Sequence, residues 1–496
     1  MKRHTWRAIT LGASSYPTNR APLGASVRSA WATWALWVLA AAGLSLTLGA
    51  RTYEVGPDQE FGAIGQVPWE ALAAGDTVRI HWRPEPYHEK WAIAAVGSAE
   101  APITVTGVPG PKGELPAVDG SQASTREALD FWGEERAIIK VGGTNASPSL
   151  QPQHIVIENL EVRGARPAQT FTGRAGKASY RDNAAAIWLE SGEHLTVRNC
   201  RLHDCGNGLV SSHQTRDVLV EGCAIYGNGT ELGIYQHNVY TESEGITFQY
   251  NHLGPLRPDA FGNNLKDRSA GTVIRYNWIE GGNRLLDLVE SEYPHITERA
   301  DYRESFVYGN ILIKLADTTN TQVCHYGGDQ GDPGKFRNGT LYVCHNTVVS
   351  RRSGAVVLFK LTTARDTAVI RNNIFWCRSP AGHIQLMPSL GKATLGSNWF
   401  PRQFESMLRF VGGEEGVHIE DKQVYGDAPG FRDVDNGDFS LLSGSACSGR
   451  AGPLPAAMLP QHACTSEYVP HGGRRPRNTD GTGDLGAFGS APAKAP

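Results

Sequence analysis

A short pattern of apolar and variable positions recurs between residues 155 and 400. It reads apolar, any, apolar, any, any, Asn or Cys, any, apolar, and Ile246–Leu253 is its clearest copy. Successive copies follow at steps of 23 to 36 residues, and their sixth positions are Cys200, Cys223, Asn251, Asn277, Asn310, Asn346, Asn373 and Asn398. The positions three before and two after each of these residues are apolar throughout.

Alternating apolar positions are typical of strands, and a repeat of this length is typical of a stacked fold. Strands that return in one register would lie parallel, and each coil would bury its apolar column against its neighbours. A buried Asn at the end of the column needs hydrogen-bond partners, which the backbone and the Asn of the next coil can supply. The pattern therefore predicts an all-β solenoid with an internal asparagine ladder.

With these repeats, and with the turn-and-strand segments 74–80, 102–108 and 118–120 before them, the chain resembles the right-handed parallel β-helix proteins of the pectate-lyase-like superfamily. The resemblance covers residues 51–490 and implies a single right-handed parallel β-helix. We expect an N-terminal cap and first coils in 51–153, the repeats in 154–400, and an irregular closing segment and tail in 401–496. Polar insertions at 121–153 and 165–184 are expected on one flank, where they would wall a groove.

The N-terminal segment predicts export. Residues 1–29 carry five Lys or Arg and no acid, and residues 30–50 are uncharged and largely apolar. This is the pattern of a signal sequence or an uncleaved membrane anchor, which would leave residues 51–496 periplasmic, secreted or at the cell surface. The net charge of −3 gives no indication of a nucleic-acid partner, and a mean hydropathy of −0.33 excludes a polytopic membrane protein. We expect a monomer.

The strand after each repeat predicts a polar patch. Aligning apolar positions places Leu209, Ile234, Leu265 and Leu286 in one inward column, so Tyr235, Lys266 and Asp287 should lie in one outward row. His237 and Arg268 would lie beside this row, because they follow it by two positions.

Two stretches of this patch, Tyr235–Tyr240 and Gly262–Ser269, resemble segments of bacterial β-helix proteins. Lys266 in its context resembles the groove Lys of the chondroitinase B and alginate lyase family. In that family the Lys is a base, an Arg about one coil onward assists it, and calcium held by carboxylates and Asn neutralises the uronate. The position one coil after Lys266 is Asp287 here, not Arg.

Elimination from a uronic acid requires a base for the C5 proton and neutralisation of the carboxylate. We therefore predict a polysaccharide lyase that acts on an acidic polysaccharide. The predicted catalytic residues are Lys266, Arg268 and His237. The predicted substrate-binding residues are Tyr235, Asn238, Tyr240, Asn264 and Arg284. Asp287 and Glu290 are predicted to hold Ca²⁺, which would cancel the opposing charge of Asp287.

Three alternatives stay open from the residues alone. Lys266 and Asp287 could form a cross-coil ion pair on a solvated face. A polygalacturonase-like glycoside hydrolase would need two carboxyl groups about 5–10 Å apart, for which Asp287 with Glu290 or Asp259 is conceivable. A non-catalytic glycan-binding surface protein would use the long flank of the solenoid for adhesion.

Two pairs of cysteines outside this site carry predictions of their own. Cys447 and Cys464 flank a short loop, and export would permit a disulfide between them. Cys200 and Cys223 occupy the ladder position of adjacent coils, and we expect stacked, buried thiols there.

Overall fold

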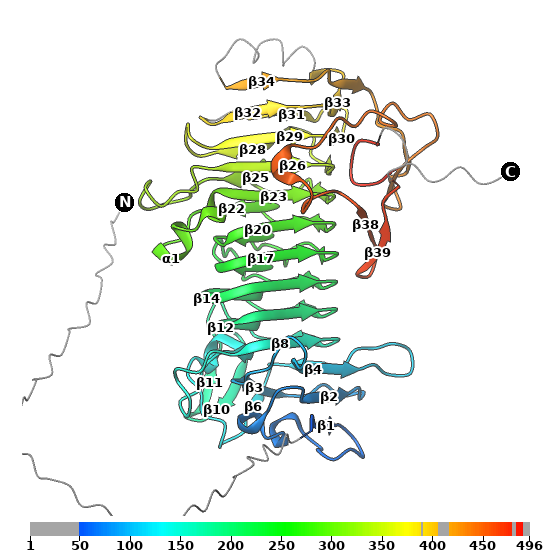
Figure 1. The fold of residues 1–496 in the computed structure, drawn as a ribbon. Helices are drawn as coiled ribbons and strands as arrows, with labels where there is room; N and C mark the ends of the chain where they lie inside the picture. The colour runs from blue at the N-terminus through cyan, green and yellow to red at the C-terminus, as the bar shows by residue number, and fades with distance from the viewer. Residues whose placement is uncertain (1–48, 388–389, 405–415, 479–482, 490–496) are drawn as a thin grey trace, which may run out of the picture. The chain divides into compact units, whose positions relative to one another are not determined.

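The computed structural model describes residues 49–387, 390–404, 416–478 and 483–489, and these form a right-handed parallel β-helix (Figure 1). The predicted fold class is confirmed. The predicted export segment lies almost entirely in residues 1–48, outside the described residues. None of the helices in the described part of the chain has the length and apolar character to span a membrane.

Each central coil contributes one strand, or half of a long strand, to each of three faces. We number the faces 1 to 3 in the order in which the chain passes through them within a coil. Face 1 consists of β3 (Glu89–Ile93), β7 (Ala137–Val141), the first halves of β12 (Ala185–Arg198) and β14 (Asn207–Glu221), β16 (Val239–Thr241), β19 (Leu265–Asp267), β22 (Leu286–Leu288), β25 (Gln322–Tyr326), β28 (Ala355–Leu361) and β31 (His383–Gln385).

Face 2 follows in each coil and carries the first part of the sequence repeat. It consists of β1 (Thr52–Val55), β2 (Thr77–His81), β4 (Ile103–Val108), β8 (Gln153–Glu158), the second halves of β12 and β14, β17 (Ser243–Gln249), β20 (Ala270–Arg275), β23 (Glu304–Tyr308), β26 (Thr340–Cys344), β29 (Thr367–Arg371), β32 (Lys392–Leu395) and β34 (Val417–Ile419).

Face 3 carries the last apolar position of the repeat. It consists of β5 (Ala117–Asp119), β9 (Glu161–Arg163), β13 (Arg201–His203), β15 (Ala224–Tyr226), β18 (His252–Leu253), β21 (Trp278–Glu280), β24 (Ile311–Lys314), β27 (Thr347–Ser350), β30 (Ile374–Cys377), β33 (Trp399–Pro401) and β35 (Val424–Gly426).

The strands form because their alternate positions are apolar and are buried inside the coils. In β20 the burial alternates residue by residue, and Phe248 and Ile274 on neighbouring face 2 strands are fully buried Cα partners. Parallel stacking lets each such side chain pack against the equivalent one above and below, which gives one continuous core along the solenoid.

The asparagine ladder between faces 2 and 3 is confirmed. The Asn277 amide accepts the backbone N–H of Asn251 at 3.0 Å, and its Nδ2 donates to the Phe248 carbonyl at 3.0 Å and to Asn310 Oδ1 at 3.0 Å. The same pattern continues to Asn398, which donates to Gln423 Oε1 at 3.2 Å. Gln423 thus extends the ladder by one coil beyond the last repeat found in the sequence, into β34 and β35.

The C-terminal segment lies along the flank of face 3, where it runs back beside coils that precede it in the chain (Figure 1). Phe431, Phe439, Leu441 and Phe488 pack there against side chains such as Ile311 and Trp399. The outer surface of these face 3 strands is apolar, so the segment completes a second core. It also includes the hairpins β36 (Phe431–Asp433) with β37 (Asp438–Leu441) and β38 (Ser466–Val469) with β39 (Gly473–Pro476).

The predicted Cys447–Cys464 disulfide is wrong, because both thiols are free and buried. Cys447 packs in the face 3 flank core, whereas Cys464 packs in a separate cluster around Tyr276 and Tyr308. Short spacing along the chain therefore does not bring them together. Cys200 and Cys223 are free, buried thiols, as expected.

Candidate functional site

The outward side of face 1 carries a row of side chains on consecutive strands, which we call the outer row. The strand register makes each member the Cα partner of the next: Lys140, Trp188, Val210, Tyr240, Lys266, Asp287, His325 and Lys360. The inward positions just before them, such as Leu209, Val239, Leu265 and Leu286, are buried in the core. The predicted adjacency of Lys266 and Asp287 is confirmed.

The predicted placement of Tyr235 in this row is wrong. Val239, not Ile234, occupies the inward column, so Tyr240 is the outward neighbour of Lys266. Ile234 and Tyr235 lie in the loop before β16 and are 52% and 72% exposed. The loop between β15 and β16 is longer than the alignment of apolar letters assumed, and this length shifts the register by five positions.

Asp287 is the centre of the site. Its carboxylate is fully buried and accepts hydrogen bonds from Lys266 Nζ at 2.8 Å and Asn263 Nδ2 at 2.7 Å on Oδ2. Oδ1 contacts His325 Nδ1 at 2.8 Å and Arg284 at 3.4 Å. Burial alone would raise the pKa of Asp287, but the His325 hydrogen bond and the charges of Lys266 and Arg284 hold it well below the usual range.

Lys266 lies between two carboxylates. Besides Asp287, its Nζ donates to Asp329 Oδ2 at 3.0 Å, from the glycine-rich loop that follows β25. Glu290 fixes this loop, because its buried carboxylate accepts the backbone N–H groups of Asp329 at 2.7 Å and Gln330 at 3.0 Å. The cross-coil ion pair exists, but it is largely buried rather than solvated: only 10% of the Lys266 side chain is exposed.

Arg268 and Tyr240 form a second polar contact beside Lys266. The Arg268 guanidinium bonds to the backbone carbonyl of Glu290 and lies 3.7 Å from its carboxylate. Burial lowers the pKa of Arg268, but the nearby Tyr240, Glu290 and Glu242 side chains more than offset this and raise it. A cation and a hydroxyl group able to transfer a proton therefore lie on the same side of Lys266.

His237 is buried and neutral. Its Nδ1 accepts the backbone N–H of Asn263 at 2.9 Å, which places the ring proton on Nε2. Burial, with the charge of Lys266, lowers the pKa of His237 to about 3. Nε2 makes no hydrogen bond to any residue that the structure describes, so the ring can offer this N–H to a ligand.

Asn238 and Asn264 lie inside the solenoid rather than in the patch. Both are fully buried, and together with Asn228 they form a second asparagine ladder between faces 3 and 1. Asn238 Nδ2 donates to Asn264 Oδ1 at 3.2 Å and to the Gly254 carbonyl at 2.8 Å. The expectation that these amides face a substrate does not fit this position.

Arg284 contacts the site from its edge. Its Nε donates to Gln322 Oε1 at 2.7 Å, and 19% of its side chain is exposed. It therefore contributes positive charge to Asp287 while remaining partly accessible.

Asp287 and Glu290 do not fit the expected calcium ion. Calcium takes six to eight oxygen ligands, whereas the Asp287 oxygens are surrounded by N–H donors and cations, and those of Glu290 bind backbone N–H groups. Across the described ranges of the chain, no group of three or more His, Cys, Asp or Glu side chains is placed to hold a metal ion.

Three residues of the site are not among the predicted catalytic, substrate-binding and metal-binding residues: His325, Asp329 and Glu242. Burial raises the pKa of Glu242, whose carboxylate accepts the Ser291 hydroxyl at 2.6 Å. Burial would also raise the pKa of Asp329, but Lys266 more than offsets this and lowers it. Spacing could have found Glu242, which follows Tyr240 by two positions as Arg268 follows Lys266.

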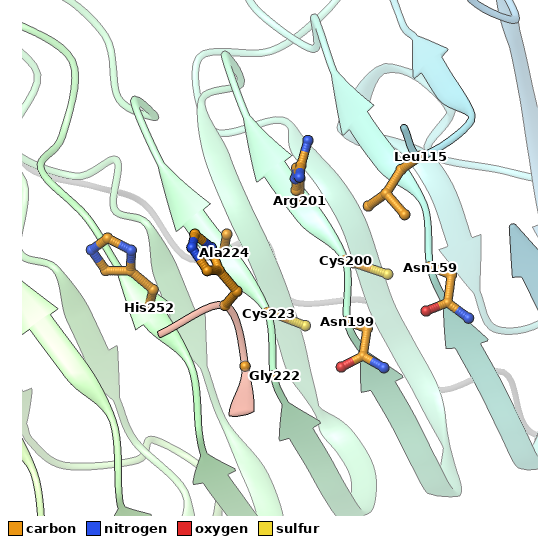
Figure 2. A pocket seen from close by; sticks show the side chains of 11 residues that line it. Leu115, Asn159, Asn199, Cys200, Arg201, Gly222, Cys223, Ala224 and His252 are labelled. Carbon is orange, nitrogen blue, oxygen red and sulfur yellow. The ribbon is translucent and has the colours of Figure 1, made fainter. Parts of the chain in front are cut away.

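A cavity of about 330 Å³ lies elsewhere, at the turn between faces 2 and 3 (Figure 2). Asn159, Asn199, Arg201 and His252 line it, together with His471 from the C-terminal segment. The His252 ring is bonded to Glu280 at 3.4 Å. Among the residues that the structure describes, no carboxyl group and no outer-row residue lines this cavity, so it is a different site from the one around Lys266.

Residues 147–299 match the family described as "Right handed beta helix region". A search of curated proteins finds no match. Similar solved structures include an alginate lyase from Paenibacillus sp. str. FPU-7, at 15% identity over 69% of this chain and 99% of that chain with a TM-score of 0.43. Others are pectate lyase Pel9A, at 12% identity over 89% and 96% with a TM-score of 0.46, and a GH136 lacto-N-biosidase from Eubacterium ramulus, at 11% identity over 74% and 68% with a TM-score of 0.37.

Likenesses at this level carry no argument about activity. The matched region covers the central coils and includes Lys266. The match and the strand register identify the chain as a right-handed β-helix protein.

Proposed function

We propose that the protein binds an acidic polysaccharide along the outward side of face 1 and cleaves it by β-elimination beside Lys266. The observation that carries the proposal is the grouping of Tyr240, Lys266 and Arg268, in which two cations flank a phenol on one partly enclosed surface. This grouping supplies the two requirements of the reaction, charge neutralisation and proton transfer.

In the proposed reaction Lys266 and Arg268 face the uronate carboxylate. Neutralising that group stabilises the negative charge that develops when the C5–H bond breaks. The proton passes to the base, the C5 electron pair forms the C4–C5 double bond, and the C4–O bond breaks. The leaving oxygen then takes up a proton, so the products are a new chain end and an unsaturated sugar.

The sequence alone predicts that Lys266 is the base, but the contacts of Lys266 favour another role. Lys266 Nζ is ion-paired with both Asp287 and Asp329, an arrangement that suits a cation that binds a carboxylate better than a base that must accept a proton. We therefore assign Lys266 to carboxylate binding and the proton transfer to Tyr240, which would accept the C5 proton as a phenolate and then return it as a phenol to the leaving oxygen. His237 would donate Nε2–H to the sugar, and Asp287 would position Lys266.

A second candidate function is glycoside hydrolysis, favoured by the opposite pKa shifts of Glu242 and Asp329. A carboxyl with a raised pKa suits a general acid, and one with a lowered pKa suits a base or nucleophile. The pair first considered, Asp287 with Glu290, is unsuitable because both side chains are at most 1% exposed and fully hydrogen-bonded.

The test is incubation of the purified protein with a panel of uronate polymers, followed by ultraviolet absorbance and reducing-end assays. Elimination predicts an absorbing product that Tyr240→Phe abolishes. Lys266→Arg should retain substantial turnover if Lys266 binds the carboxylate, and should be inactive if it is the base, because a guanidinium cannot accept the proton. Reducing ends without absorbance, lost in Glu242→Gln, would instead establish hydrolysis, and retention without cleavage would establish binding only.

We also propose that residues 30–50 direct export, because this uncharged, largely apolar stretch follows a segment with five Lys or Arg and no acid. Fractionation should find the chain in the periplasm, the medium or the membrane. Recovery of a full-length soluble cytoplasmic protein would contradict this.

A further inference from the structure

We propose that Trp132 is a stacking platform for a sugar ring, in an outer subsite at the N-terminal end of the outer row. This inference rests on the proposed function and adds to it a requirement for chain length. Trp132 lies in the predicted insertion 121–153, just before η3 (Glu134–Arg136) and β7.

The Trp132 indole is held in a fixed orientation. Its Nε1 donates to Glu190 Oε1 at 2.6 Å, and Lys140 Nζ lies 3.8 Å from its ring centroid. Lys140 is 1% exposed, lies 2.8 Å from Glu190 Oε2 and donates to the Trp132 carbonyl at 3.2 Å. The buried ammonium thus links the backbone and the side chains of this cluster.

Trp132 is nevertheless 36% exposed, although most large apolar residues in the described parts of the chain are buried. A rigid, exposed aromatic ring offers a flat surface to the C–H face of a pyranose, and its fixed orientation lowers the entropy cost of binding.

Arg136 gives this subsite a preference for acidic sugars. Its guanidinium lies 4.8 Å from the ring centroid of Trp188, and it forms no ion pair with any residue in the described parts of the chain. A uronate on Trp132 could therefore pair with a cation that is not already neutralised. Lys140 could not serve in this way, because Glu190 already pairs with it.

The strand register fixes how far this subsite lies from Lys266. Lys140 and Lys266 are separated by four strand steps along the outer row, through Trp188, Val210 and Tyr240. At about 4.8 Å per step the separation is about 19 Å, the length of several linked pyranose units. A chain that reaches both positions must run along the solenoid axis, and a disaccharide cannot occupy both.

The test compares Trp132→Ala with Tyr226→Ala, a control on face 3 whose ring is 39% exposed. For a long polyuronate, Trp132→Ala should raise KM about tenfold, equivalent to about 1.4 kcal/mol, with kcat unchanged. KM for a short oligouronate should not change, and the control should behave as wild type with both substrates. An unchanged KM for the polymer, or an equal rise for both substrates, would overturn the inference.

Arg136→Gln provides a second variant that leaves the Trp132 contacts in place and decides the question if Trp132→Ala does not fold. It should raise KM for the polyuronate and not for the short oligouronate, and an unchanged polymer KM would overturn the inference. If wild type cleaves no polymer, electrophoresis through gels containing the polyuronate replaces kinetics. Retardation lost in Trp132→Ala or Arg136→Gln would then support the subsite while the proposed reaction fails, and retardation equal to wild type would overturn the subsite.

Discussion

The most direct test of the site architecture is Asp287→Ala. This change removes the acceptor shared by Lys266, Asn263, His325 and Arg284. It leaves the Lys266 and Arg284 cations partly buried beside the space that the carboxylate occupied. Loss of one partner from a buried charge pair costs about 3–5 kcal/mol. Asp329 still pairs with Lys266 and is 29% exposed, so we expect the lower half of this range, about 3–4 kcal/mol.

Lys266→Met is the informative comparison, because it removes the ammonium and keeps most of the side-chain volume. The Asp287 carboxylate would retain three donors, so we expect a loss of about 1–2 kcal/mol. Asp427→Ala is the surface control. Asp427 is 83% exposed, and its ion pair with Arg402 is screened by solvent, so its loss should change stability very little.

Urea unfolding monitored by far-ultraviolet circular dichroism and by tryptophan fluorescence would measure these differences. Coincident transitions are required before free energies are compared. The expected order of destabilisation is Asp287→Ala, then Lys266→Met, then Asp427→Ala, and the Asp287 and Lys266 changes should not be additive because the side chains are in contact. An Asp287→Ala variant no less stable than Lys266→Met would refute the assignment of Asp287 as the centre of the site.

Three further outcomes follow from the structure. Val239→Asp should unfold or aggregate the protein whereas Ile234→Asp should leave its melting temperature unchanged, since only Val239 is buried; equal melting of both variants would contradict the register. Because the pKa of His237 is about 3 when folded and about 6.5 when unfolded, its stabilising contribution is complete above pH 6.5 and is lost as the pH falls toward 3. His237→Gln should therefore lose about 2–3 kcal/mol less than wild type between pH 7 and pH 4.5, and parallel losses would show that His237 does not titrate in this way. A reducing agent should not change the melting temperature, and both Cys447 and Cys464 should react with an alkylating reagent after unfolding without reduction; a reductant-dependent mass shift would show a disulfide.

The fold was predictable because it is determined mainly by a repeat that can be read directly along the sequence. Each coil must return an apolar position and an amide to the same place, so residues such as Phe248 and Asn277 form columns that can be counted along the sequence. The sequence did not predict Gln423 as a member of the ladder, because its coil has Gln where the repeat requires Asn or Cys. Its side chain nevertheless makes the same contacts as an Asn at this position.

The site was predictable only where coils are short. Lys266 and Asp287 are 21 residues apart, separated by one short coil in which only β20 and β21 intervene, so alignment of the leucines before them was sufficient. His325 lies 38 residues after Asp287, beyond α1 (Pro294–Thr297) and η4 (Ala300–Arg303), and counting apolar positions across that distance fails. Asn238 and Asn264 show a different problem. Residue type alone does not distinguish an Asn that lies in a ladder inside the solenoid from an Asn that lies on its surface.

The position of Lys266 depends on the interior of the solenoid as well as on its surface. Asp267, the next residue of β19, points inward and accepts hydrogen bonds from Thr241 at 2.8 Å and Thr272 at 2.6 Å. The fully buried Arg337 lies 3.5 Å from its carboxylate and also donates to its backbone carbonyl at 3.2 Å. Because adjacent strand residues share one backbone, this network and the Asp287 cluster hold β19 from its two sides. The geometry of the proposed site therefore requires that the charge pair inside the coil remain intact.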